Sequence, residues 1–266
     1  MKVYISADIE GITTTTAWEE TDRNHLSSQP HLQQMTDEVL AVIEGAKNAG
    51  ATEIVVRDAH DTARNIDFMK MPDGVTLIRG WRGAPYSMVD CIDSSFDAAL
   101  FVGYHSPASR MGNPMSHTNT LRAAYIKINN IITSEFLLYS FAAALEGVPS
   151  VFLSGDKMLC EDSASLHPSL ITCPVKECMG NMTINYPVKD TIRKIRELSE
   201  KALKQDLSSA LVKLPDYFDV EVCFKEHQSA EKAAWFPNVS RKSDCVVTFS
   251  SNDYFEILRT ILWILG

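Results

Sequence analysis

The N-terminal part of the chain alternates between strand and helix patterns, and this order limits the folds open to it. Residues 2–8 form an apolar strand pattern, and the apolar spacing over residues 31–50 is that of an amphipathic helix closed by glycine. Residues 54–56 give a second short apolar strand. Two strands joined by a crossover helix build a parallel sheet, so the chain is expected to begin with a βαβ unit.

The rest of the chain continues this pattern and then changes character near residue 180. Further strands are predicted at residues 75–78, 98–102, 124–128, 149–153 and 170–175, and helices at residues 87–91 and 136–145. After them come helices at 191–207, 230–235 and 254–265 and strands at 220–224 and 246–249. We therefore expect an α/β fold, with a Rossmann-like, three-layer N-terminal domain over residues 1–180 and a smaller α+β C-terminal domain over residues 181–266.

The bulk properties exclude several classes of partner. A formal net charge of -9 argues against nucleic acid and anionic membrane surfaces. The most apolar C-terminal stretch, residues 257–265, contains Arg259 and is too short to span a bilayer. The chain enters its first strand without a signal-peptide pattern, and its six cysteines show no regular spacing. We expect a cytoplasmic protein with reduced thiols and with neither a membrane nor a nucleic acid as partner.

Side chains that can bind metal ions follow several of the predicted strands. Asp8 and Glu10 follow the first strand, His60 follows the second, and His105 follows the strand at residues 98–102. Ligands of open α/β sheets collect beyond the carboxyl ends of the strands, so these side chains are expected to lie together. Two neighbouring carboxylates would repel each other and be costly to bury unless a cation lies between them.

Two further residues become candidates for the same site when they are considered together with these strand-end side chains. Glu135 precedes the helix at residues 136–145, a position where the helix dipole alone favours a carboxylate. His117 lies in a loop before a predicted strand, where a histidine at the surface or in a turn is common. Each has a structural explanation of its own. Together with the strand-end residues they indicate a metalloenzyme that carries out metal-assisted hydrolysis.

Six short motifs occur in the order and spacing found in one enzyme family. They are S-x-D-x-E-G at residues 6–11, D-x-H at 58–60, G-Y-H at 103–105, Ser-His-Thr at 116–118, Ile-Asn at 128–129 followed by Glu135, and Ser-Gly-Asp at 154–156. The chain resembles the DppA-type zinc D-aminopeptidases over essentially its whole length. It departs from them at Asn130 and Ser134, where the family usually has glycines, and at Lys157, where a second aspartate is expected close to the cleft. Asn130 tolerates a positive φ and Ser134 can cap the helix.

The resemblance implies two Zn²⁺ ions per chain, and Mn²⁺ or Co²⁺ would also suit the donor types. By matching positions, Asp8 would bridge the two ions. Glu10 and His105 would complete one site, and His60 and Glu135 the other.

The resemblance also implies a role for His117, as the catalytic histidine that acts as general acid or base or as a nucleophile. Asp58 would orient the nearby His60, or would simply be a solvated acid at the end of a strand. The implied activity is that of an aminopeptidase on short peptides, extended to D-amino acids, in a ring-like homo-oligomer that the resemblance suggests is a decamer. The alternatives are another metal-dependent hydrolase, such as an amidase, deacetylase or phosphoesterase, and a non-catalytic metal-binding assembly protein.

Overall fold

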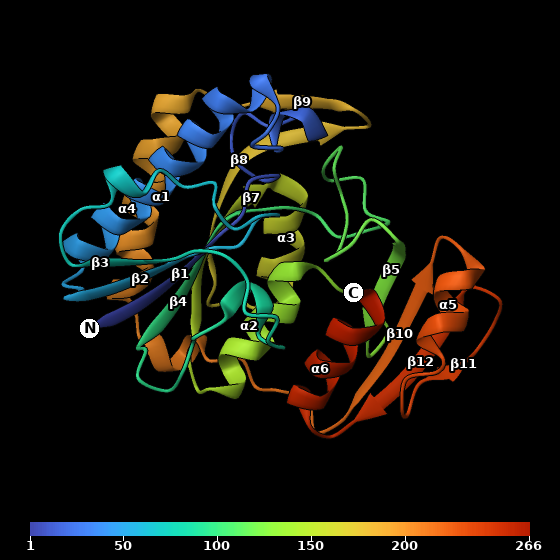
Figure 1. The fold of residues 1–266 in the computed structure, drawn as a ribbon. Coiled ribbons are helices and arrows are strands. Elements are labelled where there is room, and N and C mark those ends of the chain that lie inside the picture. Colours follow the sequence, from blue (N-terminus) through green and yellow to red (C-terminus); the bar gives the residue numbers. More distant parts are fainter.

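A seven-stranded sheet forms the centre of the protein in the computed structural model, which describes residues 1–266 (Figure 1). The strands lie in the order β3-β2-β1-β4-β7-β8-β9. Their bounds are β1 (Lys2–Ala7), β2 (Glu53–Asp58), β3 (Val75–Ile78), β4 (Ala98–Tyr104), β7 (Ser150–Asp156), β8 (Ile171–Met179) and β9 (Met182–Asn185). All neighbouring strands are parallel except β8 and β9, which form an antiparallel hairpin at one edge.

Helices cover both faces of this sheet, so the predicted three-layer α/β architecture is confirmed. α1 (Gln29–Asn48) and α4 (Val188–Lys204) pack together on one face, while α2 (Glu135–Leu145) and α3 (Lys157–Leu166) pack against β4, β7 and β8 (Figure 1). Successive strand residues point to opposite faces. On β1, Val3 and Ile5 therefore join the apolar cluster under α1 and α4, and Tyr4 joins the cluster under α2.

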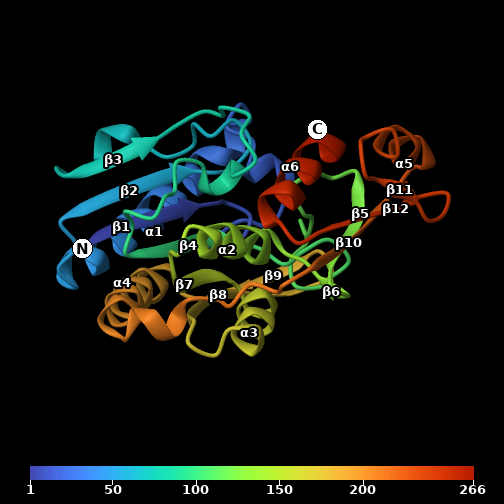
Figure 2. The same ribbon diagram turned by 90° about the horizontal axis from the view of Figure 1, so that it is seen from below.

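A smaller antiparallel sheet stands at the other end of the molecule, with the strand order β11-β12-β10-β5-β6. Its strands are β5 (Ala123–Ile128), β6 (Ile131–Ile132), β10 (Phe218–Phe224), β11 (Ser240–Arg241) and β12 (Val246–Ser251). α5 (His227–Ala233) packs on β10 and β12, and α6 (Tyr254–Leu265) lies between this sheet and α2 (Figures 1 and 2). Apolar residues of α6 belong to the same cluster as those of α2, so the two sheets share one core.

Two segments cross the expected boundary near residue 180. The strand predicted at residues 124–128 was assigned to the first domain, but β5 pairs with β10 of the smaller sheet. Its alternating burial, with Lys127 partly exposed, fits a sheet that has one solvated face, whereas β4 and β7 are buried throughout. In the other direction, α4 follows residue 180 in the chain but packs against α1 of the first part. The division into residues 1–180 and 181–266 stays a prediction about the layout of the chain, and elements on each side of it pack with elements on the other side.

Other elements differ in extent from the sequence prediction. The strand predicted at residues 170–175 continues to Met179, and α3 was not anticipated. Five single turns of 3-10 helix complete the fold, at Trp18–Glu20, Leu26–Ser28, Phe68–Lys70, Ser87–Val89 and Leu207–Ala210. All six cysteines are free; only Cys160 and Cys173 are buried, and Cys91 is exposed. None of the helices combines the length and the apolar character needed to cross a membrane.

The order of the strands reverses between β1 and β4, which places a topological switch point there. The main chain after β1 approaches β4 very closely: the Gly11 N–H donates to the Gly103 carbonyl oxygen at 2.8 Å. A Cβ atom on Gly11 would lie 1.7 Å from the Tyr104 carbonyl oxygen. Only glycine fits at this position, which explains the last residue of the S-x-D-x-E-G motif.

Candidate metal centre

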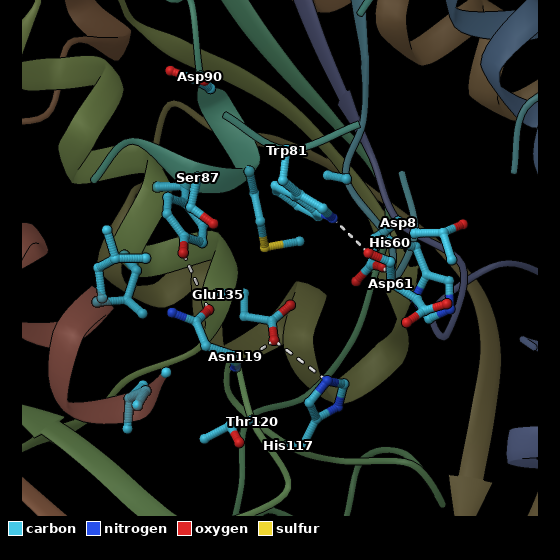
Figure 3. A pocket seen from close by; sticks show the side chains of 18 of the residues that line it. Asp8, His60, Asp61, Trp81, Ser87, Asp90, His117, Asn119, Thr120 and Glu135 are labelled. Atoms are coloured by element: carbon cyan, nitrogen blue, oxygen red, sulfur yellow. Dashed lines mark hydrogen bonds and ion pairs between the residues drawn. The ribbon is translucent and has the colours of Figure 1, made fainter. Parts of the chain in front are cut away.

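The structure brings all six predicted site residues together at the carboxyl edge of the large sheet. Five of them are buried, and His117 is partly exposed. They come from separate elements: Asp8 directly after β1, Glu10 in the turn that follows, His60 after β2, His105 after β4, Glu135 as the first residue of α2, and His117 in the loop between β4 and β5. Figure 3 shows Asp8 and His60 beside Glu135 and His117.

Two sets of donor atoms share Asp8. His60 Nδ1 lies 3.4 Å from Asp8 Oδ1 and 3.1 Å from Glu10 Oε2. His105 Nε2 lies 3.6 Å from Asp8 Oδ2 and 3.3 Å from Glu135 Oε2. Within each set the three donor atoms lie no more than 4.8 Å apart. Each oxygen of Asp8 therefore belongs to a different set, which is the arrangement that a carboxylate bridging two ions requires.

In the two sets that contain Asp8, the other candidate ligands are grouped differently from the pairs that the resemblance implied. Glu10 stands with His60, and His105 stands with Glu135, in the two sets that contain Asp8. The grouping within the sets that contain Asp8 follows from the strand order: β2 and β4 lie on opposite sides of β1, so each histidine meets a different oxygen of Asp8. Glu10 and His105 also occur together, in a third group with His117, so the pairs that the resemblance implied stay a prediction.

Main-chain carbonyl groups determine which nitrogen each buried histidine presents. A carbonyl oxygen only accepts hydrogen bonds, so His60 Nε2 donates to Thr21 O at 3.2 Å and His105 Nδ1 donates to Ser106 O at 2.9 Å. The remaining nitrogens, Nδ1 of His60 and Nε2 of His105, face the carboxylates. Hydrogen bonds of this kind hold metal-binding imidazoles in one tautomer and one orientation.

His117 lies at the border between the buried ligands and the cavity. Its ring stacks on that of His105, with centroids 4.4 Å apart and planes 10° apart, and it meets the edge of Trp18 at 5.3 Å. Nδ1 donates to Met115 O at 2.9 Å, and Nε2 lies 3.5 Å from Glu135 Oε1. Because the ring lines the cavity, it can exchange a proton with a molecule bound there.

The buried carboxylates need positive charge close to them. Burial, followed by the charge of Glu10, raises the pKa of Asp8 well above its usual range. Burial opposes protonation of His105, but Glu135, Glu10 and Asp8 together raise its pKa to about 10. Burial also opposes protonation of His60, and Glu10 and Asp8 still raise its pKa well above the usual value. Protons on the two imidazoles thus balance the carboxylates as long as no metal ion does so.

Three donor atoms at the centre of the site are buried without a hydrogen-bond partner: Asp8 Oδ2, Glu10 Oε2 and His105 Nε2. Buried polar atoms normally have such a partner, so atoms like these need another explanation. Sets of imidazole nitrogens and carboxylate oxygens suit Zn²⁺, and three protein ligands leave a coordination position open for water. The donor set therefore fits two zinc ions.

Several residues that support the ligands were not anticipated from the sequence. The Asn119 N–H donates to Glu135 Oε1 at 2.6 Å. Lys176 Nζ and Asn113 Nδ2 both donate to the main-chain carbonyl oxygen of Glu10, at 2.6 Å and 2.9 Å. One signal for them exists in the sequence, because Lys176 directly follows the apolar residues Pro174 and Val175 of a predicted strand. The predicted strand ended one residue before it.

The contacts of two charged residues near the site can be compared with expectation. Asp58 is fully buried, so it is not a solvated acid, and it reaches the His60 main chain through Asn65 rather than the His60 ring. It accepts hydrogen bonds from the main chain and side chain of Asn65, whose Nδ2 donates to the His60 carbonyl oxygen at 2.7 Å, so it holds the loop after β2. Lys157 does not line the cavity and instead pairs with Glu177 at 3.3 Å. The change of charge at residue 157 is therefore not directed at a bound molecule.

A cavity of about 970 Å³ opens beside the ligand sets. Residues of the long loop before α1 form part of its wall, as do the last turns of α6. Trp81 and its neighbours form another part, and Figure 3 shows Trp81 beside the cavity. The loop at residues 13–30 is long for a compact domain, and loops of that length are often functional. It contributes four lining residues: Trp18, Thr21, Asp22 and Asn24.

Comparison with known proteins gives a consistent result. The family model Peptidase_M55, described as D-aminopeptidase, matches residues 1–263. A D-aminopeptidase of Bacillus subtilis (strain 168) is 29% identical over 265 residues, which cover 98% of this chain and 96% of the relative. A solved structure, "Zn-dependent D-aminopeptidase DppA from Bacillus subtilis, a self-compartmentalizing protease", matches with a TM-score of 0.93 at 28% identity. That match covers 99% of this chain and 96% of the other.

Proposed function

Because this chain belongs to the D-aminopeptidase family, we propose that it is a zinc-dependent aminopeptidase that binds two ions per chain and hydrolyses short peptides. The observation that carries the proposal is the division of Asp8 between two ligand sets, one oxygen in each. The similar solved structure is described as Zn-dependent, and the imidazole and carboxylate donors of this chain suit the same metal.

Zinc ions bound to these ligands would supply a Lewis acid for the scissile carbonyl group and a bound water that ionises near neutral pH. The chain itself supplies the proton transfer. His117 Nε2 lies at the cavity, 3.5 Å from Glu135 Oε1, while its Nδ1 is held by Met115 O. We assign His117 to proton transfer with the attacking water and the leaving amine. The Asn119 N–H keeps Glu135 in place during this step.

The charges around the cavity favour a peptide with a free amine over a phosphate ester. Arg82 is the only lysine or arginine among the lining residues, and it is paired with Asp90 at 2.6 Å. Asp22 and Asp61 line the cavity outside the ligand sets. Acidic side chains on the wall away from the ligand sets favour an ammonium group over a phosphate dianion at that part of the substrate. This observation favours an aminopeptidase over a phosphoesterase, and it leaves the amidase and deacetylase alternatives to experiment.

The same proposal includes the stereochemistry of the substrate and the assembly of the chain into an oligomer. The relatives are D-aminopeptidases, and we assign this chain a preference for a D-residue at the amino end of the peptide. The solved relative is described as self-compartmentalizing, which supports a ring-like homo-oligomer here, with the ten subunits that the family resemblance suggests. A compartment of that kind admits short peptides and excludes folded proteins.

The test uses the full chain purified without added metal. Elemental analysis should find about two zinc ions per chain, and the protein should release D-alanine from D-Ala-D-Ala faster than L-alanine from L-Ala-L-Ala. Chelation should abolish release, and zinc should restore it. A phosphate ester and an acetylated lysine serve as substrates for the alternatives. A protein that holds no zinc after reconstitution and releases no amino acid would overturn the proposal. Light scattering gives the number of subunits.

A further inference from the structure

Lys176 is a fully buried cation that has no carboxylate partner. It lies on β8 with 0% of its surface exposed, and none of the ion pairs of the structure includes it. A buried charge without compensation is strongly destabilising. The contacts that Lys176 makes instead should therefore show what the chain gains from a lysine there.

The ammonium group of Lys176 is directed at the turn that carries the metal ligands. Nζ donates to Glu10 O at 2.6 Å, to Thr15 O at 2.6 Å and to Thr15 Oγ1 at 3.0 Å. Thr15 Oγ1 in turn donates to Ile9 O at 2.9 Å and to Glu10 O at 3.0 Å. The Lys176 bonds join residues more than 160 positions apart in the chain and tie β8 to the Glu10 main chain.

The turn is held from its other side as well. The N–H groups of Asp8 and Gly11 donate to Val102 O and Gly103 O of β4, both at 2.8 Å. Hydrogen bonds from β4 therefore fix the main chain on either side of Glu10, and Lys176 fixes its carbonyl oxygen. The Glu10 side chain is thus held by backbone contacts, and the Lys176 contact is the only charged one among them.

We propose that Lys176 is a positioning residue that acts through the Glu10 main chain to hold the Asp8, Glu10 and His60 set in its metal-binding geometry. The inference rests on the proposed function, because it assumes that this set binds zinc. It assigns no such role to Lys176 in the set of Asp8, His105 and Glu135, whose residues it does not contact. Changes in the support of a ligand typically cost about 10-fold to 100-fold in metal affinity.

The test first disables one ligand set by mutation, so that zinc binding by the other set can be measured alone, and then replaces the lysine. Glu135→Ala leaves the Glu10 set complete, and Glu10→Ala leaves the His105 set complete. Lys176→Met is added to each variant and to the wild type, and zinc affinity is measured by chelator competition. We expect a loss of about 10-fold or more in the Glu135→Ala background and a change below about 3-fold in the Glu10→Ala background. Binding of Co²⁺ gives an independent spectroscopic readout of the geometry of each set.

Matched variants keep the test decisive. Lys157→Met removes a lysine from an exposed ion pair with Glu177 and should leave both affinities unchanged. If Lys176→Met does not fold, Thr15→Val removes the hydroxyl from the same network with almost no change in shape. It should then weaken the same set alone. Equal losses in both backgrounds, or no loss in either, would overturn the positioning role. A wild type without zinc would refute the proposed function itself.

Discussion

Asp8 contributes one carboxylate oxygen to each ligand set, which distinguishes it from every other ligand. Asp8→Ala should therefore lose both zinc ions, while Glu10→Ala and Glu135→Ala should each lose mainly one. Elemental analysis of the three variants, purified side by side, gives the stoichiometry. Equal metal loss in all three would contradict the bridging role of Asp8.

His117 is the one site histidine that is partly exposed and belongs to neither set that contains Asp8. His117→Ala should retain close to two zinc ions and lose about 100-fold or more in kcat, because positioned general acids and bases contribute about that much. The exposed His227 on α5 provides the control, and His227→Ala should behave like the wild type. Wild-type turnover by the His117 variant would contradict its catalytic role.

The raised pKa values of His60 and His105 predict how zinc binding depends on pH. Protonation of these residues stabilises the metal-free protein. This contribution is complete below about pH 6.5, the usual value for histidine in an unfolded chain. It is lost as the pH rises through the folded-state values, which for His105 lie at about 10. Zinc needs neutral imidazoles and must displace these protons.

Zinc affinity should therefore rise between about pH 6 and pH 8, while the Tm of the chelated protein should fall over the same range. Activity should decline in acid as zinc is released. Chelator competition and thermal unfolding at matched ionic strength measure the two trends. An affinity that does not change with pH would show that these histidines are not zinc ligands.

The sequence contained enough information to predict which side chains gather at the edge of the large sheet, while their roles as ligands and their pairing stay predictions. The strand ends identified Asp8 and His105 because parallel strands deliver their carboxyl ends to one edge. The cap predicted at Ser134 is also confirmed, since its hydroxyl accepts a hydrogen bond from Leu137 N. Pairing depends on which side of β1 each strand lies, and that order is a property of the whole sheet. Lys176 was missed because its partners lie more than 160 residues away in the chain.

At the scale of elements, the turn after β1 depends on a close approach to β4. An alanine at position 11 would place its Cβ 1.7 Å from Tyr104 O and 2.7 Å from Gly103 C, and backbone atoms cannot move aside as a flexible side chain can. The turn would have to shift and take Glu10 with it. Gly11→Ala should destabilise the protein by about 1–3 kcal/mol and weaken the ion of the Glu10 set.

Gly50→Ala is the matched control for this change. Its Cβ would meet nothing within 4 Å, but its φ of 92° makes alanine strained. It should therefore cost about 1–2 kcal/mol through backbone strain and leave zinc affinity unchanged. Denaturant unfolding and chelator competition on both variants separate the two effects. Unchanged zinc binding in Gly11→Ala would contradict the link between the close approach and the ligand geometry.

Helices and strands with a clear hydrophobic period could be predicted from the sequence, whereas the elements that they pair with were harder to predict. The helix predicted at residues 31–50 corresponds to α1, and the strand at 54–56 lies within β2. β5 was predicted in the right place and within residues 1–180, but its partner β10 lies beyond them, because a strand pattern does not identify the neighbouring strands. Its partly exposed Lys127 was the available signal for an antiparallel sheet with one solvated face.

At the scale of the whole molecule, the family and the enzyme class predicted from the six motifs are confirmed by the family match over residues 1–263. The motifs were informative because they span both sides of the switch point. Together the motifs specify side chains along a whole edge of the sheet, whereas any one of them is compatible with many folds. The internal division of the molecule was harder to predict, because residues on either side of position 180 complete each other's layers.

This interlocking predicts that residues 1–180 do not fold alone. Without α4, the cluster under α1 loses Ile195, Ala202 and Leu203, and without β10 the β5 strand loses its partner in the smaller sheet. The fragment should lack a cooperative thermal transition and bind hydrophobic dyes, while the full chain unfolds in one transition. A longer fragment, residues 1–204, restores α4 and should gain helix content without gaining cooperativity. Calorimetry and circular dichroism on all three chains test this. A sharp transition in the shortest fragment would establish residues 1–180 as an independent folding unit.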